Sequence, residues 1–209
     1  MMEIRRFESD LLSSNMYLIV EGDHGIVIDP CRNITPAEGL VIDYILLTHE
    51  HYDHISGVLA WKEATGAMVL CSQACGENIQ SPRRNLASTF TVFCELQTWV
   101  KLDKLPDADS QFSCHADETF EDETVLTWRG HAFKLFALPG HSLGSIGIVL
   151  DDKFFFSGDT LIEGVQIALR LPGGSKTRWN TIGAPRLAKL PEGLIVCPGH
   201  FGSFIYKRK

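Results

Sequence analysis

The pattern of apolar and polar positions predicts a run of short strands at the beginning of the chain. Apolar-rich segments at 2–8, 15–21 and 25–28 are separated by polar or glycine turns, which is typical of a β-meander. The run at 44–47 is continuously aliphatic or aromatic, so it predicts a buried strand, and 68–71 predicts another. The first half of the chain is therefore rich in strands.

A helix is predicted between the last two of these strands. Apolar residues at Ile55, Val58, Leu59 and Ala64 recur at helical spacing, and Gly66 follows them. Glycine is a common residue immediately after a helix, because it adopts the left-handed conformation there without strain. We therefore predict a helix over 55–64.

The second half of the chain repeats the alternation of strands and turns. Four strands are predicted there, at 125–128, 131–137, 146–150 and 154–156. They are followed by a helix at 180–189, despite Pro185, and by a strand at 194–197. With 209 residues and 44% hydrophobic content, the chain is long enough for one sizeable core. We expect a single domain over residues 1–209.

Composition narrows the classes of partner. The net charge of −7 argues against a nucleic-acid surface, because phosphate binding needs clustered Lys and Arg. No run approaches the roughly 20 apolar residues of a membrane span, and the N-terminal residues 1–7 lack the apolar core of a signal peptide. We expect a cytoplasmic protein that acts on a small molecule, with no nucleic-acid or membrane partner; the oligomeric state stays open.

The six cysteines contain no C-x-x-C pair and are interpreted as reduced thiols. Cys71 and Cys75 are four residues apart, which would place them on one helical face and offer a second metal site. With no matching pair downstream, the favoured interpretation is that both are small buried apolar residues.

Candidate chemistry begins directly after the strand at 44–47, with the segment His49-Glu50-His51-Tyr52-Asp53-His54. In extended backbone, residues two apart point the same way, so His49 and His51 can converge on one ion. Asp53 and His54 lie at the turn into the next element. Imidazole and carboxylate are ligands for borderline divalent ions such as zinc, and isolated histidines rarely cluster in this way. The cluster predicts a metal site.

Three further motifs each follow a predicted strand. They are Leu138-Pro139-Gly140-His141-Ser142, Ser157-Gly158-Asp159-Thr160-Leu161 and Pro198-Gly199-His200. Together with the first cluster, in this order, they resemble the H-x-H-x-D-H and companion motifs of the metallo-β-lactamase fold superfamily. The resemblance implies an α/β (α+β) fold, a four-layer αβ/βα sandwich with metals at one edge between the sheets.

The same resemblance implies the roles of the ligands. His49, His51 and His141 would bind one metal, Asp53, His54 and His200 the other, and Asp159 would bridge both. Asp29 matches an aspartate that orders the histidine loop through hydrogen bonds.

The ions implied by this ligand set are two divalent metal ions. We expect Zn²⁺, with Fe or Mn as alternatives, and the two ions together would hold a hydroxide that attacks the substrate. Asp53 is also the candidate for a catalytic proton shuttle, and Tyr52 either donates to an oxyanion or packs.

Within the superfamily the complete ligand set most resembles the glyoxalase II-like group, which hydrolyses thioesters such as hydroxyacylglutathione. Glyoxalase II enzymes carry an additional C-terminal helical domain that contacts glutathione. This chain stops nine residues after His200. The resemblance therefore predicts thioester hydrolysis but does not by itself predict specificity for glutathione. A lactonase is the nearest alternative. A persulfide dioxygenase with one iron, bound by two histidines and an aspartate, is an alternative of another class, whereas a nuclease and a non-catalytic binding module are disfavoured.

Several residues stay outside the motifs. The segment 72–117 holds Phe90, Phe93, Trp99 and Phe112, and is interpreted either as a helical wall of the substrate pocket or, preferably, as core packing. Lys176 and Arg178 are weak candidates for binding a substrate carboxylate. His24, His115 and His131 are interpreted as structural or surface residues.

Overall fold

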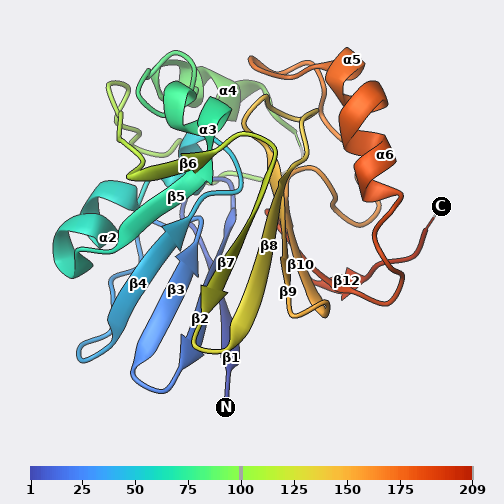
Figure 1. Ribbon diagram of the computed structural model, residues 1–209. Coiled ribbons are helices and arrows are strands. Elements are labelled where there is room, and N and C mark those ends of the chain that lie inside the picture. Colours follow the sequence, from blue (N-terminus) through green and yellow to red (C-terminus); the bar gives the residue numbers. More distant parts are fainter. Residues whose placement is uncertain (99–100, 209) are drawn as a thin grey trace.

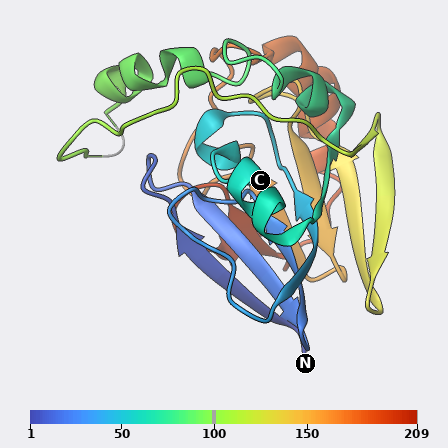
Figure 2. The same cartoon turned by 90° about the vertical axis from the view of Figure 1, so that its left-hand side faces the viewer.

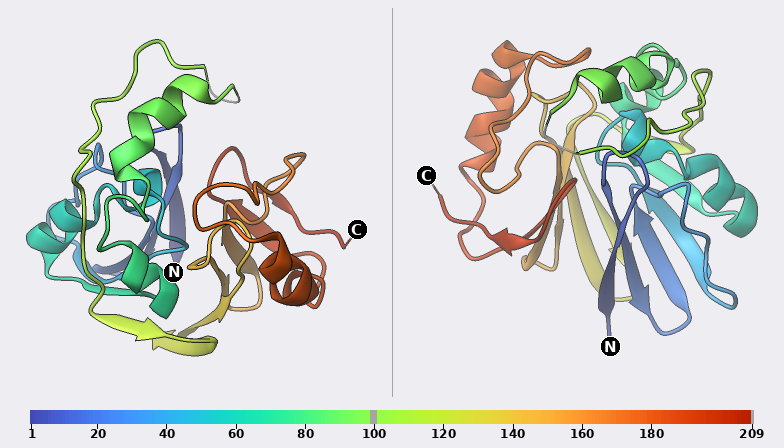
Figure 3. Two further views of the ribbon diagram at one scale, coloured as in Figure 1. Left: turned by 90° about the horizontal axis from the view of Figure 1, so that it is seen from above. Right: turned by 180° about the vertical axis from the view of Figure 1, so that it is seen from behind.

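Two six-stranded sheets stack face to face, and helices cover their outer faces (Figure 1). The computed structural model describes residues 1–98 and 101–208. The side view and the views from above and behind show the N-terminal half of the chain on one side of the stack and the C-terminal half on the other (Figures 2 and 3). The four-layer αβ/βα sandwich predicted from the motifs is confirmed.

The first sheet has the order β1-β2-β3-β4-β5-β6. Its strands span Glu3–Glu8, Asn15–Glu21, His24–Ile28, Val41–Leu46, Met68–Ser72 and Glu118–Phe120. The first three pair antiparallel, which confirms the meander, and β3 to β6 pair parallel. The three-residue β6 was not predicted, because so short a strand carries no recognisable alternation.

The second sheet has the order β12-β11-β10-β9-β8-β7. In chain order from β7 to β12, its strands span Glu123–Trp128, His131–Ala137, Ile146–Leu150, Phe154–Gly158, Ile195–Pro198 and Phe204–Ile205. Neighbours pair antiparallel except β10 and β11, which are parallel. The predicted strands are confirmed to within a few residues, and only the two-residue β12 was missed.

Alternation along the strands divides the apolar side chains between two faces. In β2, Tyr17 and Ile19 face the core between the sheets, whereas Met16 and Leu18 face the helices. In β10, Phe156 faces the core between the sheets and Phe155 the outer layer. The central strands β2, β3, β9 and β10 are therefore buried on both faces, which explains why they read as continuous apolar runs, whereas the edge strands β1 and β7 are partly exposed.

The N-terminal half contains four helices and one 3₁₀ turn. They are α1 (Tyr52–Ile55), α2 (Val58–Thr65), α3 (Gln73–Asn78), the 3₁₀ turn η1 (Ala87–Thr89) and α4 (Phe90–Leu96). The helix predicted over 55–64 is thus interrupted at Ser56-Gly57, and it stops at Gly66 as expected. A Cβ at Gly57 would lie 2.6 Å from the carbonyl of Pro30, so the chain bends there in close contact with the end of β3.

The helix predicted over 180–189 lies earlier and is irregular. It consists of α5 (Lys176–Arg178), the π-helical segment η2 (Trp179–Gly183) and α6 (Ala184–Leu187). Pro185 at the start of α6 has no N–H to donate to the preceding turn, so the wider turn before it relieves the interrupted hydrogen bonding. Among the described residues, no helix is long and apolar enough to cross a membrane.

Candidate metal centre

All the predicted metal-binding motifs follow strands, in loops except for Asp53 and His54, which lie in α1. The first follows β4, His141 follows β8, Asp159 comes directly after β10, and His200 comes two residues after β11. Strands β10 and β11 are parallel, so their carboxyl ends meet at one edge of the second sheet. The loops converge there with the loop after β4, as the hydrogen bond from Ile146 N to Thr48 O (2.8 Å) shows.

The first cluster joins His49, His51 and His141. One ring nitrogen from each of them lies within 4.8 Å of the other two, and all three side chains are buried. The Nε2 of His141 lies 3.0 Å from the Nδ1 of His51. Two ligand nitrogens of one tetrahedral ion lie about 3.3 Å apart, so this approach fits lone pairs that converge on a cation.

The second cluster joins Asp53, His54 and His200 in the same way. The Asp53 Oδ2 lies 3.5 Å from the Nε2 atoms of both His54 and His200. These separations exceed the roughly 2.7–2.9 Å of a charge-assisted hydrogen bond, and they match the spacing of ligands around one ion.

Asp159 stands between the two clusters. Its Oδ2 lies 3.6 Å from His141 Nε2 and 3.4 Å from His200 Nε2, and its Oδ1 lies 3.4 Å from His54 Nε2. One carboxylate thus approaches a histidine of each cluster. This is the position that the resemblance assigned to a bridging ligand.

Atoms left without hydrogen-bond partners provide the test of fit to metal ions. In the described part of the chain, they include His49 Nε2, His54 Nε2 and Asp159 Oδ1, which are buried. A buried polar atom without a partner costs about 1–3 kcal/mol, so such atoms are normally paired. Their convergence in two groups of the borderline ligand types fits two divalent metal ions.

Three histidines have their Nδ1 atoms held by acceptors, which directs the Nε2 lone pairs into the clusters. Thr48 Oγ1 donates to Asp29 Oδ2 at 2.6 Å, so it must accept from His49 Nδ1 at 3.0 Å. His54 Nδ1 donates to the same Asp29 oxygen, and His200 Nδ1 donates to the carbonyl of Leu12. Such partners fix the tautomer of a metal-binding histidine.

The expected role of Asp29 is confirmed. Its Oδ1 accepts from Thr48 N at 2.8 Å, and its Oδ2 accepts from Thr48 Oγ1 and His54 Nδ1. Asp29 also lies near His49 and His54 in a third group with metal-binding geometry. Because both of its oxygens are already used as acceptors, we assign it to orienting the histidine loop rather than to binding an ion.

The end of the loop between β1 and β2 and the first residue of β2 hold the second cluster in place, a role that the sequence did not reveal. Ser14 Oγ donates to Asp53 O at 2.8 Å, and Asn15 N donates to Gly199 O at 2.7 Å. The Asn15 side chain also donates to the carbonyl of Pro198 at 2.9 Å. These contacts are not apparent from sequence, because a Ser-Ser-Asn loop has no pattern that distinguishes it from any other turn.

Glu50 is the second functional residue that sequence reasoning missed. Its buried carboxylate accepts hydrogen bonds from Ser142 Oγ (2.7 Å), Asn78 Nδ2 (2.8 Å) and Gly144 N (3.4 Å). It therefore ties the loop of His49 and His51 to the loop of His141 and to helix α3. Burial raises its pKa, and the bonds from Ser142 and Asn78 oppose that shift.

The two clusters differ in how strongly they favour protons. Burial, with neighbouring imidazoles, holds the pKa of His49 well below its usual value and lowers that of His51 to about 3. Burial opposes protonation of His54 and His200 too, but the carboxylates outweigh it. They raise the pKa of His54 well above its usual range and that of His200 to about 9.

A cavity of about 320 Å³ opens onto both clusters. His51, Asp53, His141, Asp159 and His200 reach its surface, and the other lining residues are Leu86, Phe90, Phe93, Ile162, Val165, Gln166, Ala168, Leu171 and Phe201. Segment 72–117 therefore does contribute a wall, through α4 and the turn before it, although core packing was the preferred interpretation. Phe112 packs in the core, and Trp99 lies outside the described residues.

Tyr52 packs and does not face the substrate cavity. Its side chain is 2% exposed, its ring meets Phe90 and Phe112 edge-on or tilted, and its hydroxyl accepts from Asp109 N at 3.0 Å. The oxyanion role considered for it is wrong, because this residue begins α1 and points into the core between that helix and α4.

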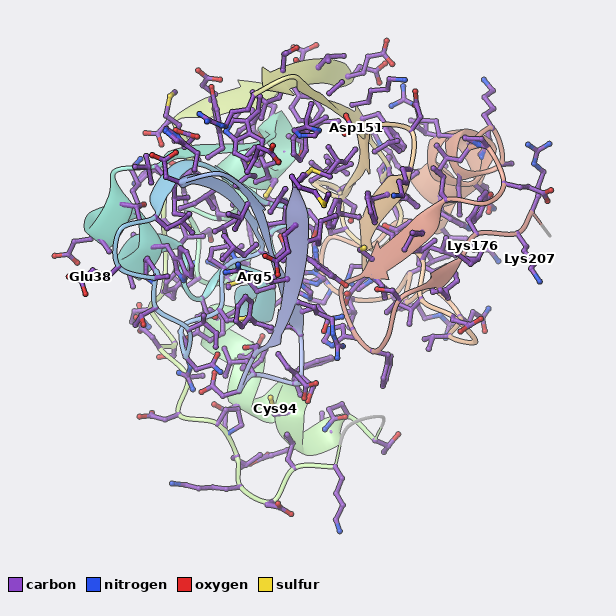
Figure 4. All side chains as sticks on the ribbon, turned by 90° about the horizontal axis from the view of Figure 1, so that it is seen from below. Arg5, Glu38, Cys94, Asp151, Lys176 and Lys207 are labelled. Atoms are coloured by element: carbon purple, nitrogen blue, oxygen red, sulfur yellow. The ribbon has the colours of Figure 1, made fainter. Side chains whose placement is uncertain are left out.

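Neither cation proposed for a substrate carboxylate reaches the cavity. Lys176 and Arg178 are exposed residues of α5 and are absent from the cavity lining. Figure 4 shows Lys176 with the C-terminal elements, well apart from Cys94 on α4. Their position outside the cavity lining therefore contradicts this hypothesis.

The histidines outside the motifs and the cysteines are structural or surface residues, as the sequence favoured. His24 pairs with Asp43 and His131 with Asp151, at 2.8 and 2.6 Å, and His115 is exposed. Cys71 and Cys75 do not share a helical face, because β5 continues through Ser72 and α3 begins only at Gln73. All six cysteines are buried free thiols.

The comparison with known families agrees with this geometry. The model of the metallo-beta-lactamase superfamily matches residues 9–200, which include every motif of the site. The chain belongs to the metallo-beta-lactamase superfamily. As a member of it, the chain is a metallo-hydrolase whose buried histidine and aspartate clusters are consistent with a dinuclear metal site.

Individual curated proteins are similar to this chain to different degrees. "Probable metallo-hydrolase YqgX" of Bacillus subtilis (strain 168) is 26% identical over 206 residues, covering 95% of this chain and 90% of that protein. Hydroxyacylglutathione hydrolase of Pseudomonas entomophila (strain L48) is 31% identical over 165 residues, covering 78% of this chain and 49% of that protein. The chain thus matches about half the length of that hydrolase.

One similar solved structure contains metal ions. The structure of TTHA1623 in a di-iron-bound form superposes with a TM-score of 0.70 at 25% identity, covering 96% of this chain and 94% of that one. Iron is thus the metal in that similar protein.

Acidification is predicted to empty the second cluster before the first. Below the raised pKa values of His54 and His200, metal must displace protons from both, so its affinity for the second cluster falls as pH decreases. The pKa values of His49, His51 and His141 are lowered by burial, so protons compete for the first cluster only at lower pH. Elemental analysis after dialysis at steps from about pH 8 to about pH 5 should show a one-ion intermediate. Simultaneous loss of both ions in a protein that circular dichroism shows to be folded would contradict this.

Glu50→Gln is predicted to weaken the first cluster selectively. Glutamine offers one acceptor oxygen and turns an NH₂ group towards donors, which costs about 1–3 kcal/mol and loosens the loop of His141. Metal content should fall towards one ion per chain, with a lower melting temperature. Glu63→Gln on the exposed face of α2 is the matched control; unchanged metal content in Glu50→Gln would refute the role.

Proposed function

We propose that this chain is a dinuclear metal-dependent hydrolase that cleaves a small-molecule thioester of the hydroxyacyl-thiol type or a related ester. The observation that carries the proposal is the position of Asp159, whose carboxylate approaches histidines of both clusters at 3.4–3.6 Å. Similarity to a hydroxyacylglutathione hydrolase, at 31% identity, supports a thioester as the substrate. It does not specify the acyl group or the thiol group of that thioester.

The metals proposed are two zinc ions, with iron or manganese as alternatives. His49, His51 and His141 would hold one ion, Asp53, His54 and His200 the other, and Asp159 would bind both. When bound, such ions lower the pKa of water towards about 7 and polarise a carbonyl, so that no serine or cysteine nucleophile is needed.

The protein's own residues complete the reaction site. Asp53 reaches the cavity surface, which allows its carboxylate to accept a proton from the attacking water while His54 and His200 keep it in place. Phe90 and Leu86 are nearly fully buried beside it and exclude bulk water from one wall. Electrostatic interactions are stronger in such an enclosed site.

Two other reactions are alternatives on this fold. A lactone presents the same carbonyl to the same centre, so a lactonase differs only in substrate. A persulfide dioxygenase would need one iron held by two histidines and an aspartate, whereas here a complete second set of ligands is present, which supports the hydrolase. The cytoplasmic location stays a prediction.

The test is a kinetic screen of the metal-loaded protein against thioesters and lactones. Wild-type protein should hydrolyse thioesters, and Asp159→Ala should lower kcat/KM at least about 100-fold, because loss of the shared ligand disturbs both ions. Asp152→Asn, at an exposed position whose left-handed conformation asparagine tolerates, is the control. Turnover of lactones alone, or oxygen consumption with persulfides and no hydrolysis, would overturn the thioester assignment.

A further inference from the structure

The cavity above the metal centre is apolar apart from the ligands themselves. Eight of its fourteen lining residues are apolar, five belong to the ligand set, and the last is Gln166, which is exposed. Because the ligands form the polar part of the surface, a substrate must place its reacting carbonyl there and its remaining atoms against hydrocarbon.

The apolar surface comes from two sides. Phe90 and Phe93 of α4 contribute one wall, and Ile162, Val165 and Leu171, from the segment after β10, contribute the other. In Figure 3, α4 lies on the side of the first sheet and the 162–171 segment on the side of the second. An apolar group between them would therefore contact both halves of the molecule.

No lysine or arginine lines the cavity in the described part of the chain. A carboxylate held in the apolar part of the cavity, away from the metal ions that the ligands would hold, would lose its hydration without gaining a cation, and burial of an unpaired charge is strongly unfavourable. The cavity therefore selects against substrates that carry a carboxylate at the end of the chain remote from the reacting bond.

We propose that the enzyme prefers an uncharged substrate with an apolar chain of up to about eight carbons on one side of the scissile bond, bound between α4 and the 162–171 segment. This inference rests on the proposed function and specifies its substrate class. The size follows from the volume: about 320 Å³ has room for roughly ten non-hydrogen atoms at about 30 Å³ each, which is the carbonyl and a medium chain.

The rim of the cavity limits the chain length up to which a longer apolar chain improves binding. Val165 and Phe201 line it and are 50% and 48% exposed, so atoms beyond the eighth carbon lie between half-exposed side chains and remain partly hydrated. Each methylene inside the cavity is expected to raise kcat/KM by up to about fourfold, and each one beyond the rim by much less.

The experiment uses metal-loaded protein and two series of thioesters. One varies the acyl chain from two to twelve carbons on a fixed small thiol, and the other varies the thiol on a fixed acetyl group. In one of the series, kcat/KM should rise with length and level off near eight carbons. A matched pair with six carbons, hexanoyl and adipoyl, differs only in a terminal carboxylate, and the adipoyl ester should react at least about tenfold more slowly.

Substitutions at the walls should change the preference rather than only the rate. Phe93→Ala should reduce the octanoyl-to-acetyl ratio of kcat/KM by about tenfold, because it removes hydrocarbon from one wall. Val92→Ala, at a neighbouring and 55% exposed position outside the lining, should leave that ratio unchanged. Val165→Arg places a cation at the exposed rim and should raise the adipoyl-to-hexanoyl ratio.

A binding measurement separates this inference from the proposed reaction. Methyl ketones of increasing chain length cannot be hydrolysed, and calorimetry should show that they bind more tightly with length and less tightly to Phe93→Ala. Length-dependent ketone binding without thioester hydrolysis would uphold the apolar site and overturn the proposed function. Thioester hydrolysis that is insensitive to chain length, or adipoyl hydrolysis as fast as hexanoyl, would overturn the inference alone.

Discussion

The structure depends on the convergence of buried ligand atoms that cannot satisfy one another. Histidine nitrogens and carboxylate oxygens meet at 3.4–3.6 Å, which is too long for strong hydrogen bonds, and several of them have no partner in the described residues. Such burial costs free energy in a protein without metal. Two cations resolve the conflict, since they replace missing hydrogen bonds with coordinate bonds and favour the carboxylates in their charged form.

The scaffold keeps these atoms together by dividing the task among elements that are remote in sequence. Strand ends from both sheets deliver the ligands, while Asp29 and Thr48 orient His49, and Asp29 orients His54. Glu50 connects the two loops of the first cluster, and the loop before β2 connects Asp53 to the segment of His200. The first cluster therefore relies on the buried carboxylate of Glu50, and the second on the loop before β2 together with Asp29.

Much of this arrangement was predictable because strong local patterns encode it. The strands were recognisable from their runs of apolar residues, and the metal ligands from histidines placed directly after them. The interruption at Gly57, the early helix around Trp179 and the role of Glu50 were not, because each depends on a contact between distant segments. Lys176 and Arg178 were also misinterpreted: their charge suggested anion binding, but both are exposed on α5 and neither lines the cavity.

Metal stoichiometry tests the central claim most directly. Protein purified without added metal or chelator is analysed for metal per chain, next to His200→Ala, which removes one ligand of the second cluster and leaves the first intact. The account predicts close to two ions in the wild-type protein and close to one in the variant. A single iron in both proteins would contradict a dinuclear centre and direct attention to oxygen-dependent chemistry.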